Sequence, residues 1–206
     1  MAKLLWKPSQ ERIENSNMYR FMNVINDKYH QNFSEYAPLH KWSIDNIADF
    51  WETMWEFADI IASNPYDQVI DDVTKMPGAR WFSGAQLNFA ENLLRYRDNR
   101  TALIFKGEGQ ESIKISYAEL YDEVARLAKS LKETGVQAGD RVVGFIPNMP
   151  AATIAMLAAT SLGATWSSCS PDFGLKGVLD RFGQIKPKVL FTAKHHKLAL
   201  QRLNKL

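Results

Sequence analysis

The sequence lacks several features that would assign the protein to a class at once. It has one cysteine in 206 residues, so no intrachain disulfide can form, as is usual in a reducing compartment. It has no run approaching the roughly 20 apolar residues of a membrane-spanning helix, and MAKLLWKPSQ is too weakly apolar for a secretory signal. A formal charge of +2 gives no strong electrostatic surface for nucleic acid or an anionic membrane. We therefore expect a cytoplasmic protein that binds neither.

Motifs that carry recognisable chemistry are also scarce. There is no G-x-x-x-x-G-K-[ST] loop and no G-x-G-x-x-G after a strand, so a dinucleotide site is unsupported. Residues 172–174 match the kinase D-F-G tripeptide, but the other kinase motifs are missing. The adjacent His195 and His196 point in different directions, which favours solvated side chains over a metal pair. Cys169 has no visible base and fits a packed core better than a nucleophile. The residues alone predict no catalytic group and no metal site.

What the sequence does contain is 46% hydrophobic residues and six tryptophans, enough for a core, with five of the tryptophans before residue 82. Residues 1–98 are expected to form an aromatic, helical extension. Ser16 is placed to cap one helix and Ser43 another, while residues 65–96 suggest two loops and a helix. The expected apolar faces consist of Met18, Phe21, Met22, Ile25 and Tyr29 in the first helix, and Ile44, Ile47, Trp51, Met54, Trp55 and Ala58 in the second. Packing within the protein is favoured over a partner surface.

From residue 99 the pattern becomes an alternation of strands and helices. A hairpin is followed by a helix with the capping box Ser116–Glu119, and the order β-β-α-β-α-β-α-β predicts a largely parallel sheet flanked by helices. Residues 99–206 are thus expected to be the first, incomplete part of an α/β domain. Ligands of such sheets bind beyond the carboxyl ends of the strands. Two turns should lie there, at residues 147–150 and 170–174, with Asp172 as candidate cap of the next helix.

Three long stretches carry a family resemblance: WFSGAQLNFAENLLR (81–95), GDRVVGFIPNMPAATIAMLAATSLGATWSSCSPDFG (139–174) and VLDRFGQIKPKVLFTA (178–193). In order, they closely resemble the acetoacetyl-CoA synthetase family, within the adenylate-forming acyl- and aryl-CoA ligases. The resemblance spans about residues 5–193. It implies a fold, the N-terminal part of the adenylate-forming large domain preceded by the extension of the acetyl- and acetoacetyl-CoA synthetase branch.

The resemblance also implies an activity. Such enzymes join acetoacetate to coenzyme A using ATP and Mg²⁺, through an acyl-adenylate with release of diphosphate and then AMP, in lipid or ketone-body metabolism. The family's Ser/Thr/Gly-rich phosphate loop, hinge and C-terminal lysine domain do not occur in this sequence. The resemblance therefore predicts an inactive fragment that binds no cofactor alone, and whose uncovered apolar surface would favour self-association.

By the same resemblance, a few residues are candidates for contact with the nucleotide end of coenzyme A. They are Ser170, Pro171, Asp172 and Phe173 in the turn, with Lys197 and Arg202 as nearby cations for a phosphate. The relatives have glycines where Pro171 and Asp172 stand, which argues against a close backbone approach. Two other interpretations stay open: a stand-alone binding module without catalysis, and a ligase for another short carboxylic acid.

Overall fold

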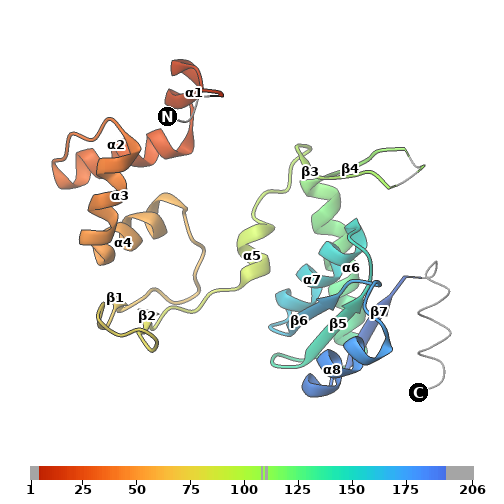
Figure 1. The fold of residues 1–206 in the computed structure, drawn as a ribbon. Coiled ribbons are helices and arrows are strands. Elements are labelled where there is room, and N and C mark those ends of the chain that lie inside the picture. The colour runs from red at the N-terminus through yellow and green to blue at the C-terminus, as the bar shows by residue number, and fades with distance from the viewer. Residues whose placement is uncertain (1–4, 108, 110, 194–206) are drawn as a thin grey trace. The chain divides into compact units, whose positions relative to one another are not determined.

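A computed structural model describes residues 5–107, 109 and 111–193 (Figure 1). The chain separates into two compact units, divided between Gln86 and Leu87. Each unit is described by itself below. The boundary expected from the sequence, after residue 98, stays a prediction.

The first unit begins with helices packed around a small aromatic core. They are α1 (Gln10–Glu14), α2 (Asn17–Tyr29), α3 (Tyr36–Asp45) and α4 (Ile47–Phe57). The capping prediction for Ser16 is confirmed, because its Oγ accepts a hydrogen bond from the Tyr19 amide at 3.1 Å. Phe21, Met22 and Ile25 are buried as expected. Met18 is 50% exposed, so the buried face of α2 is narrower than its apolar pattern suggested.

The sequence predicted that the second helix of this unit begins at Ser43, and this prediction was wrong. The structure has two helices, α3 and α4, which meet at Asn46, a residue with non-helical φ −126° and ψ 58°. Ser43 is no cap: it lies within α3, and its hydroxyl donates to the His40 carbonyl. Ile44 and Trp51 are exposed, at 57% and 42%, although the pattern placed both on the apolar face. The side of α4 that packs on the core carries Phe50, Met54 and Phe57 instead.

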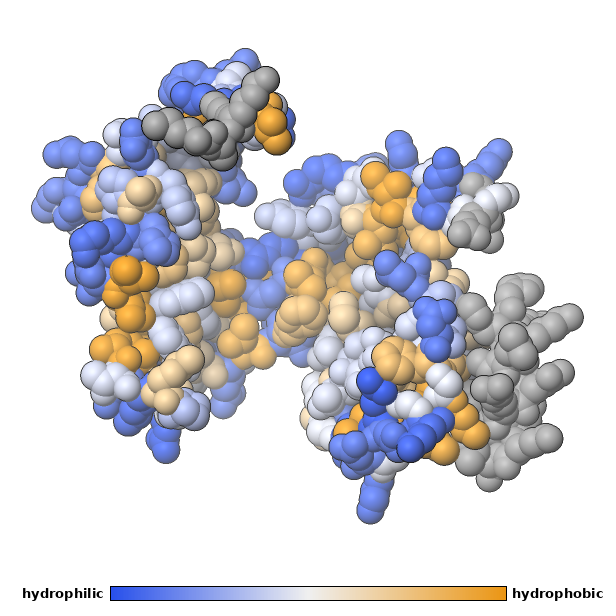
Figure 2. Space-filling view, in the orientation of Figure 1, coloured by the Kyte–Doolittle hydropathy of each residue, from blue (hydrophilic) through white to orange (hydrophobic). Residues whose placement is uncertain are grey.

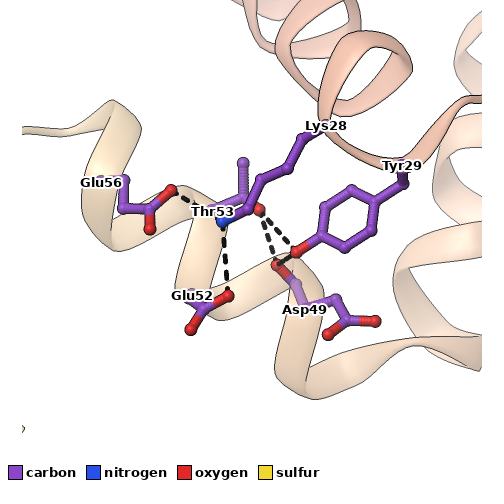
Figure 3. Close-up of polar contacts among 6 residues, drawn as sticks. All are labelled: Lys28, Tyr29, Asp49, Glu52, Thr53 and Glu56. Atoms are coloured by element: carbon purple, nitrogen blue, oxygen red, sulfur yellow. Dashed lines mark hydrogen bonds and ion pairs between the residues drawn. The ribbon is translucent and has the colours of Figure 1, made fainter.

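Polar side chains join α2 to α4 (Figure 3). The Lys28 ammonium donates to Glu56 at 2.8 Å and to Glu52 at 3.3 Å. The Glu56 bond is the main reason that the pKa of Lys28 is raised. Beside it, the Tyr29 hydroxyl lies 3.2 Å from the hydroxyl of Thr53, which is fully buried and donates to a main-chain carbonyl of its own helix. The network fixes the two helices against each other. It also gives the buried Thr53 hydroxyl its hydrogen-bond partners, as buried polar groups require.

A strand pair follows where the sequence suggested only loops. β1 (Gln68–Ile70) and β2 (Trp81–Ser83) are antiparallel, with Ile70 opposite Trp81. Three residues are too few to show an alternating pattern, which is why the pair was missed. The rings of Trp55, Tyr66 and Phe82 lie 4.6–5.3 Å apart between centroids, so an aromatic cluster holds the pair against α4.

The second unit has the predicted alternating order. It contains α5 (Phe89–Leu93), β3 (Thr101–Phe105), β4 (Ile113–Ser116), α6 (Tyr117–Glu133), β5 (Arg141–Phe145), α7 (Pro150–Ser161), β6 (Thr165–Cys169), α8 (Leu175–Ile185) and β7 (Val189–Thr192). β3 and β4 form an antiparallel hairpin, and β6, β5 and β7 form a parallel sheet in that order. The Ser116–Glu119 capping box at the start of α6 is confirmed. The α/β fold class predicted from the sequence is confirmed as well.

Helices cover both faces of the parallel sheet (Figure 1). α6 and α7 pack on one face around Val142, and α8 packs on the other around Val143. Gly144 in the central strand β5 lies against the indole of Trp166 on β6: a Cβ added there would be 2.8 Å from two ring carbons. Glycine thus makes room for a large aromatic ring beside the central strand.

Asn88 ties the start of the second unit to its interior. Its side-chain oxygen accepts from the Glu91 amide and caps α5. Its side-chain amide donates to the carbonyl of Thr160 at 3.0 Å and of Ser161 at 3.4 Å, at the end of α7. One side chain thereby bonds to groups at a helix start and at a helix end, where the Thr160 carbonyl also accepts from the Gly163 amide at 3.0 Å.

At the amino-terminal edge of the sheet, Lys188 connects two loops, the one between α8 and β7 that carries it and the one between α6 and β5. Its ammonium donates to the Gly135 carbonyl at 2.6 Å and to the Asp140 carboxylate at 2.8 Å. The same carboxylate accepts from the Gln137 amide. The hydrogen bond from Lys188 is the main reason that the pKa of Asp140 lies below its ordinary value of 3.8. This cluster holds the edge opposite to the one where ligands of such sheets bind.

We predict that replacing Lys188 with methionine makes the protein less stable at pH 7 and less sensitive to acid. The lowered pKa of folded Asp140 stabilises the fold above pH 3.8, and this contribution is lost as the pH falls through that depressed value. The difference in urea midpoint between wild type and variant should therefore shrink below pH 3.8. Lys129→Met, which breaks a more exposed pair with Glu133, should show no such pH trend. A constant difference for Lys188→Met would contradict the assignment.

Candidate functional site

The carboxyl ends of the parallel strands meet at one edge of the sheet, and this edge is the candidate site. β5 ends at Phe145, β6 at Cys169 and β7 at Thr192. The register pairs Phe145 with both of the other ends, and the Ile146 amide donates to the Cys169 carbonyl at 3.4 Å. The turns at 147–150 and 170–174 leave this edge, as the sequence predicted. The structure therefore brings together two segments that are some twenty residues apart in the chain.

The turn at 170–174 is closed by its own hydrogen bonds. The Ser170 hydroxyl donates to the Asp172 carboxylate at 2.7 Å and accepts from the Asp172 amide at 3.3 Å. The Phe173 amide donates to the Ser170 carbonyl at 3.1 Å. The prediction that Asp172 caps α8 was wrong: the N-cap is Gly174, and no side chain bonds to the helix start. Asp172 is engaged by Ser170 instead, because a short-range turn competes with a cap for the same carboxylate.

Phe173 leaves this turn and lies against the first turns of α8. The guanidinium carbon of Arg181 lies 4.1 Å from the ring centroid of Phe173. Arg181 also donates from Nη1 to the Gly177 carbonyl at 3.0 Å. A Cβ on Gly177 would be 3.2 Å from the ring. Sequence reasoning missed Arg181 as a neighbour of the turn, although its eight-residue spacing from Phe173 on a predicted helix could have suggested it.

Cys169 lies directly before the turn and is buried, with 5% of its surface exposed. Burial raises the pKa of its thiol, and the positive charge of Arg181 only partly opposes this shift. The thiol therefore stays protonated near neutral pH and is a poor nucleophile. It packs with Val143, Phe145, Val178 and Phe182 in the core beneath α8, as the sequence suggested.

The turn at 147–150 leads into α7, with Met149 as N-cap and Pro150 in the first turn. Asn148, Met149, Pro150 and Thr153 line a hollow of about 130 Å³ against the β3 strand. A larger hollow of about 440 Å³ lies where α6 and α7 meet the ends of β5 and β7. Its apolar lining includes Leu127, Ile146, Ile154 and Phe191. Both hollows open near the edge where the two turns emerge.

Several sequence-based candidates lie outside the described residues: Lys197, Arg202, His195 and His196. Within residues 5–107, 109 and 111–193, no group of three or more His, Cys, Asp and Glu side chains could hold a metal ion. Across the same part of the chain, no helix is both long and apolar enough to cross a membrane.

Comparison with protein families assigns the chain to a class. The model for the AMP-binding enzyme family matches residues 89–206, more than half of the chain. The model for the acetyl-coenzyme A synthetase N-terminus matches residues 36–93. The chain therefore belongs to the AMP-binding enzyme family, and the parallel sheet with its two turns is part of that family's region.

Individual relatives narrow the class further. The acetoacetyl-CoA synthetase of Macaca fascicularis is 44% identical over 196 residues, which cover 93% of this chain and 29% of the relative. A solved acetoacetyl-CoA synthetase from Streptomyces lividans is 42% identical with a TM-score of 0.85, over 93% of this chain and 30% of that one. A malonamoyl-CoA synthetase of Penicillium aethiopicum is 38% identical, over 92% of this chain and 27% of the relative. The chain thus resembles acetoacetyl-CoA synthetases and spans less than a third of their length.

Proposed function

We propose that this chain is the N-terminal part of an acetoacetate–CoA ligase. The proposed reaction joins acetoacetate and coenzyme A with ATP and Mg²⁺, through an acyl-adenylate, and releases diphosphate and AMP in the cytoplasm. The observation that carries the proposal is the match to acetoacetyl-CoA synthetases along 93% of the chain, in sequence and in fold. Under this proposal residues 1–98 are the family's N-terminal extension, and residues 99–206 begin its AMP-binding domain.

In this reaction the chain's own contribution is to bind and orient coenzyme A. We propose that the Ser170, Pro171, Asp172 and Phe173 turn contacts the nucleotide end of the coenzyme, with Lys197 and Arg202 as cations for its phosphates. The position of the turn at the carboxyl edge of a parallel sheet supports this assignment. Because the Asp172 carboxylate is already engaged by the Ser170 hydroxyl, the two side chains face each other rather than a ligand. Contact through Phe173 and the outer surface of the turn fits this arrangement best.

The 206-residue chain alone is predicted to release no AMP from ATP, acetoacetate and CoA. A chimera is predicted to release it: the chain replaces the matching segment of the Streptomyces lividans enzyme, whose remaining part supplies what this chain does not span. AMP formation by a coupled assay is the measurement, and that remaining part alone is the control. Turnover by the chain alone would contradict the inactive-fragment proposal. A folded but inactive chimera would contradict the ligase proposal.

A second candidate is a ligase for another short acid. The malonamoyl-CoA synthetase among the relatives supports it, because that protein matches 92% of this chain under a different substrate name. An assay of the complete encoded polypeptide with acetoacetate and with malonamate would distinguish the two. Faster turnover with malonamate would favour the second candidate.

We also propose that apolar surface on the chain favours self-association. Figure 2 shows hydrophobic side chains reaching the visible surface of both units. Among the described strands of the parallel sheet, β7 pairs only with β5, and its Leu190 is 41% exposed. An uncovered strand edge with an exposed apolar side chain is a site where chains associate.

A further inference from the structure

The candidate turn has only one large side chain that reaches the following helix. Phe173 lies between Gly177 and Arg181: the ring is in contact range of the glycine on α8, and the guanidinium covers it at 4.1 Å. Arg181 is itself held on the helix by its bond to the Gly177 carbonyl. These three residues, Phe173, Gly177 and Arg181, form what we call the ring clamp.

We infer that Arg181 is a positioning residue of the proposed coenzyme site, because the ring clamp fixes the 170–174 turn on α8. The inference rests on the proposed function only in assigning that turn to coenzyme A. It adds a residue that the sequence did not indicate and that acts through Phe173 rather than on the ligand itself.

Little besides the ring clamp holds the turn on α8. The N-cap of α8 is Gly174, which makes no side-chain bond to the helix start. A glycine at this joint leaves the backbone more freedom than any other residue. The hydrogen bonds among Ser170, Asp172 and Phe173 close the turn on itself, but none of them connects it to α8. Gly174, the last residue of the turn, is joined to α8 because its carbonyl accepts from the Val178 amide at 3.1 Å. For residues 170–173, the contact between Phe173 and Arg181 makes the side-chain connection to α8.

The chemistry of the clamp requires these residue types. A planar guanidinium stacks on an aromatic face and still donates in its plane, whereas a lysine ammonium is a compact charge that offers no flat surface. Gly177 leaves space for the ring: a Cβ would approach it to 3.2 Å, closer than most such contacts, so the ring would have to shift by a few tenths of an ångström. Phe173 remains 40% exposed, so one side of the ring is still open to a ligand.

A turn that is fixed before binding does not have to be ordered at the moment of binding. Less conformational freedom is then lost when coenzyme A is bound. The expected effect follows from a cation–aromatic contact at a partly exposed site. Losing it should change a binding equilibrium about two- to fivefold. The ring clamp should therefore act on coenzyme affinity and leave the steps that precede coenzyme binding unchanged.

The first test uses the 206-residue chain itself. Amide hydrogen exchange of Phe173, which donates to the Ser170 carbonyl, reports whether the turn is closed. Arg181→Lys should speed this exchange about two- to fivefold, and Gly177→Ala should act in the same direction. The exchange of the amide of Phe182, an α8 residue whose side chain is buried in the core, should not change. Gln184→Ala, on the same helix one turn further, is the matched control. Unchanged exchange at Phe173 in both clamp variants would overturn the inference.

The second test uses the chimera and separates the two half-reactions. Arg181→Lys should raise the KM for coenzyme A about two- to fivefold and leave acetoacetate-dependent ATP–pyrophosphate exchange unchanged, since that exchange precedes the coenzyme step. If the variant instead loses coenzyme-dependent turnover and ATP–pyrophosphate exchange to the same extent, Arg181 has a merely structural role and the inference is overturned. If the KM rises for coenzyme A but not for 3′-dephospho-CoA, Arg181 binds the 3′-phosphate directly. That result also overturns the inference. A chimera without exchange activity would defeat the proposed function, and the amide exchange of Phe173 would still decide the role of the clamp.

Discussion

Replacing Phe21 with alanine is expected to lower the free energy of unfolding by about 3–5 kcal/mol. Phe21 is 3% exposed, and its ring makes edge-on contacts with Phe50 at 5.6 Å and Phe57 at 5.2 Å between centroids. The alanine leaves a cavity that the two remaining rings, fixed on α4, fill only in part. Urea unfolding followed by circular dichroism, with hydrogen exchange of the peptides covering α2 and α4, measures the loss.

Met18 provides the matched control for this prediction. It lies on the same helix and on the face that the sequence pattern marked as apolar, but it is 50% exposed. Met18→Ala should stay within about 0.5 kcal/mol of wild type. Equal losses for the two variants would show that the buried face of α2 includes Met18.

Replacing Gly144 with alanine is expected to destabilise the protein by about 1–3 kcal/mol. The added methyl group would lie 2.8 Å from two carbons of the Trp166 ring and 3.0 Å from a methyl carbon of Ile146. Gly144 is in the central strand, with a paired strand on each side, so the strand cannot move away from the ring. The shift in urea midpoint, followed by circular dichroism, measures the effect.

Replacing Gly183 with alanine should instead stabilise the protein. Gly183 lies within α8, where an added Cβ would meet no atom within 4 Å. Alanine favours a helix over glycine by about 0.5–1 kcal/mol, so Gly183→Ala should raise the midpoint. If Gly144→Ala is also neutral or stabilising, the close packing of Trp166 on β5 is not as the structure describes it.

Much of the second unit could be predicted from its sequence because the local signals and the fold agree there. The Ser116–Glu119 box, Pro150 at the start of α7 and the positive φ of Gly135 and Gly163 mark helix ends that the structure confirms. Buried strands such as β5 appear as continuous apolar runs because helices cover both faces. The position of the two turns follows from that order alone.

The first unit was less predictable, because contacts between residues that are far apart in the sequence decide part of its structure. Asn46 interrupts a segment whose apolar pattern continues through it, so Ser43 only seemed to begin a helix. β1 and β2 depend on the aromatic cluster of Trp55, Tyr66 and Phe82, whose members come from distant positions in the chain. A local reading has no access to such contacts, whereas the capping bond of Ser16 is local and was found.

The candidate site also has one part that the sequence predicts and one that it does not. The edge that bears it follows from strand order, but the internal arrangement of the turn does not. The sequence offered Asp172 as a helix cap, and the structure gives its carboxylate to Ser170. Phe173 contacts Arg181, because Arg181 lies one helical turn after Gly177 on the side of α8 that faces the ring. Side-chain pairing of this kind is decided by competition between neighbours of similar chemistry.

The two-sided bonding of Asn88 bears on how this protein can be divided for study. The AMP-binding family model starts at residue 89, so trimming the polypeptide to that limit would delete Asn88. The shortened product would begin with an uncapped α5, and the Thr160 and Ser161 carbonyls at the end of α7 would lose their bonds from the Asn88 side chain. An expression plasmid for the α/β half should therefore start at Leu87 or earlier, where the compact unit itself begins.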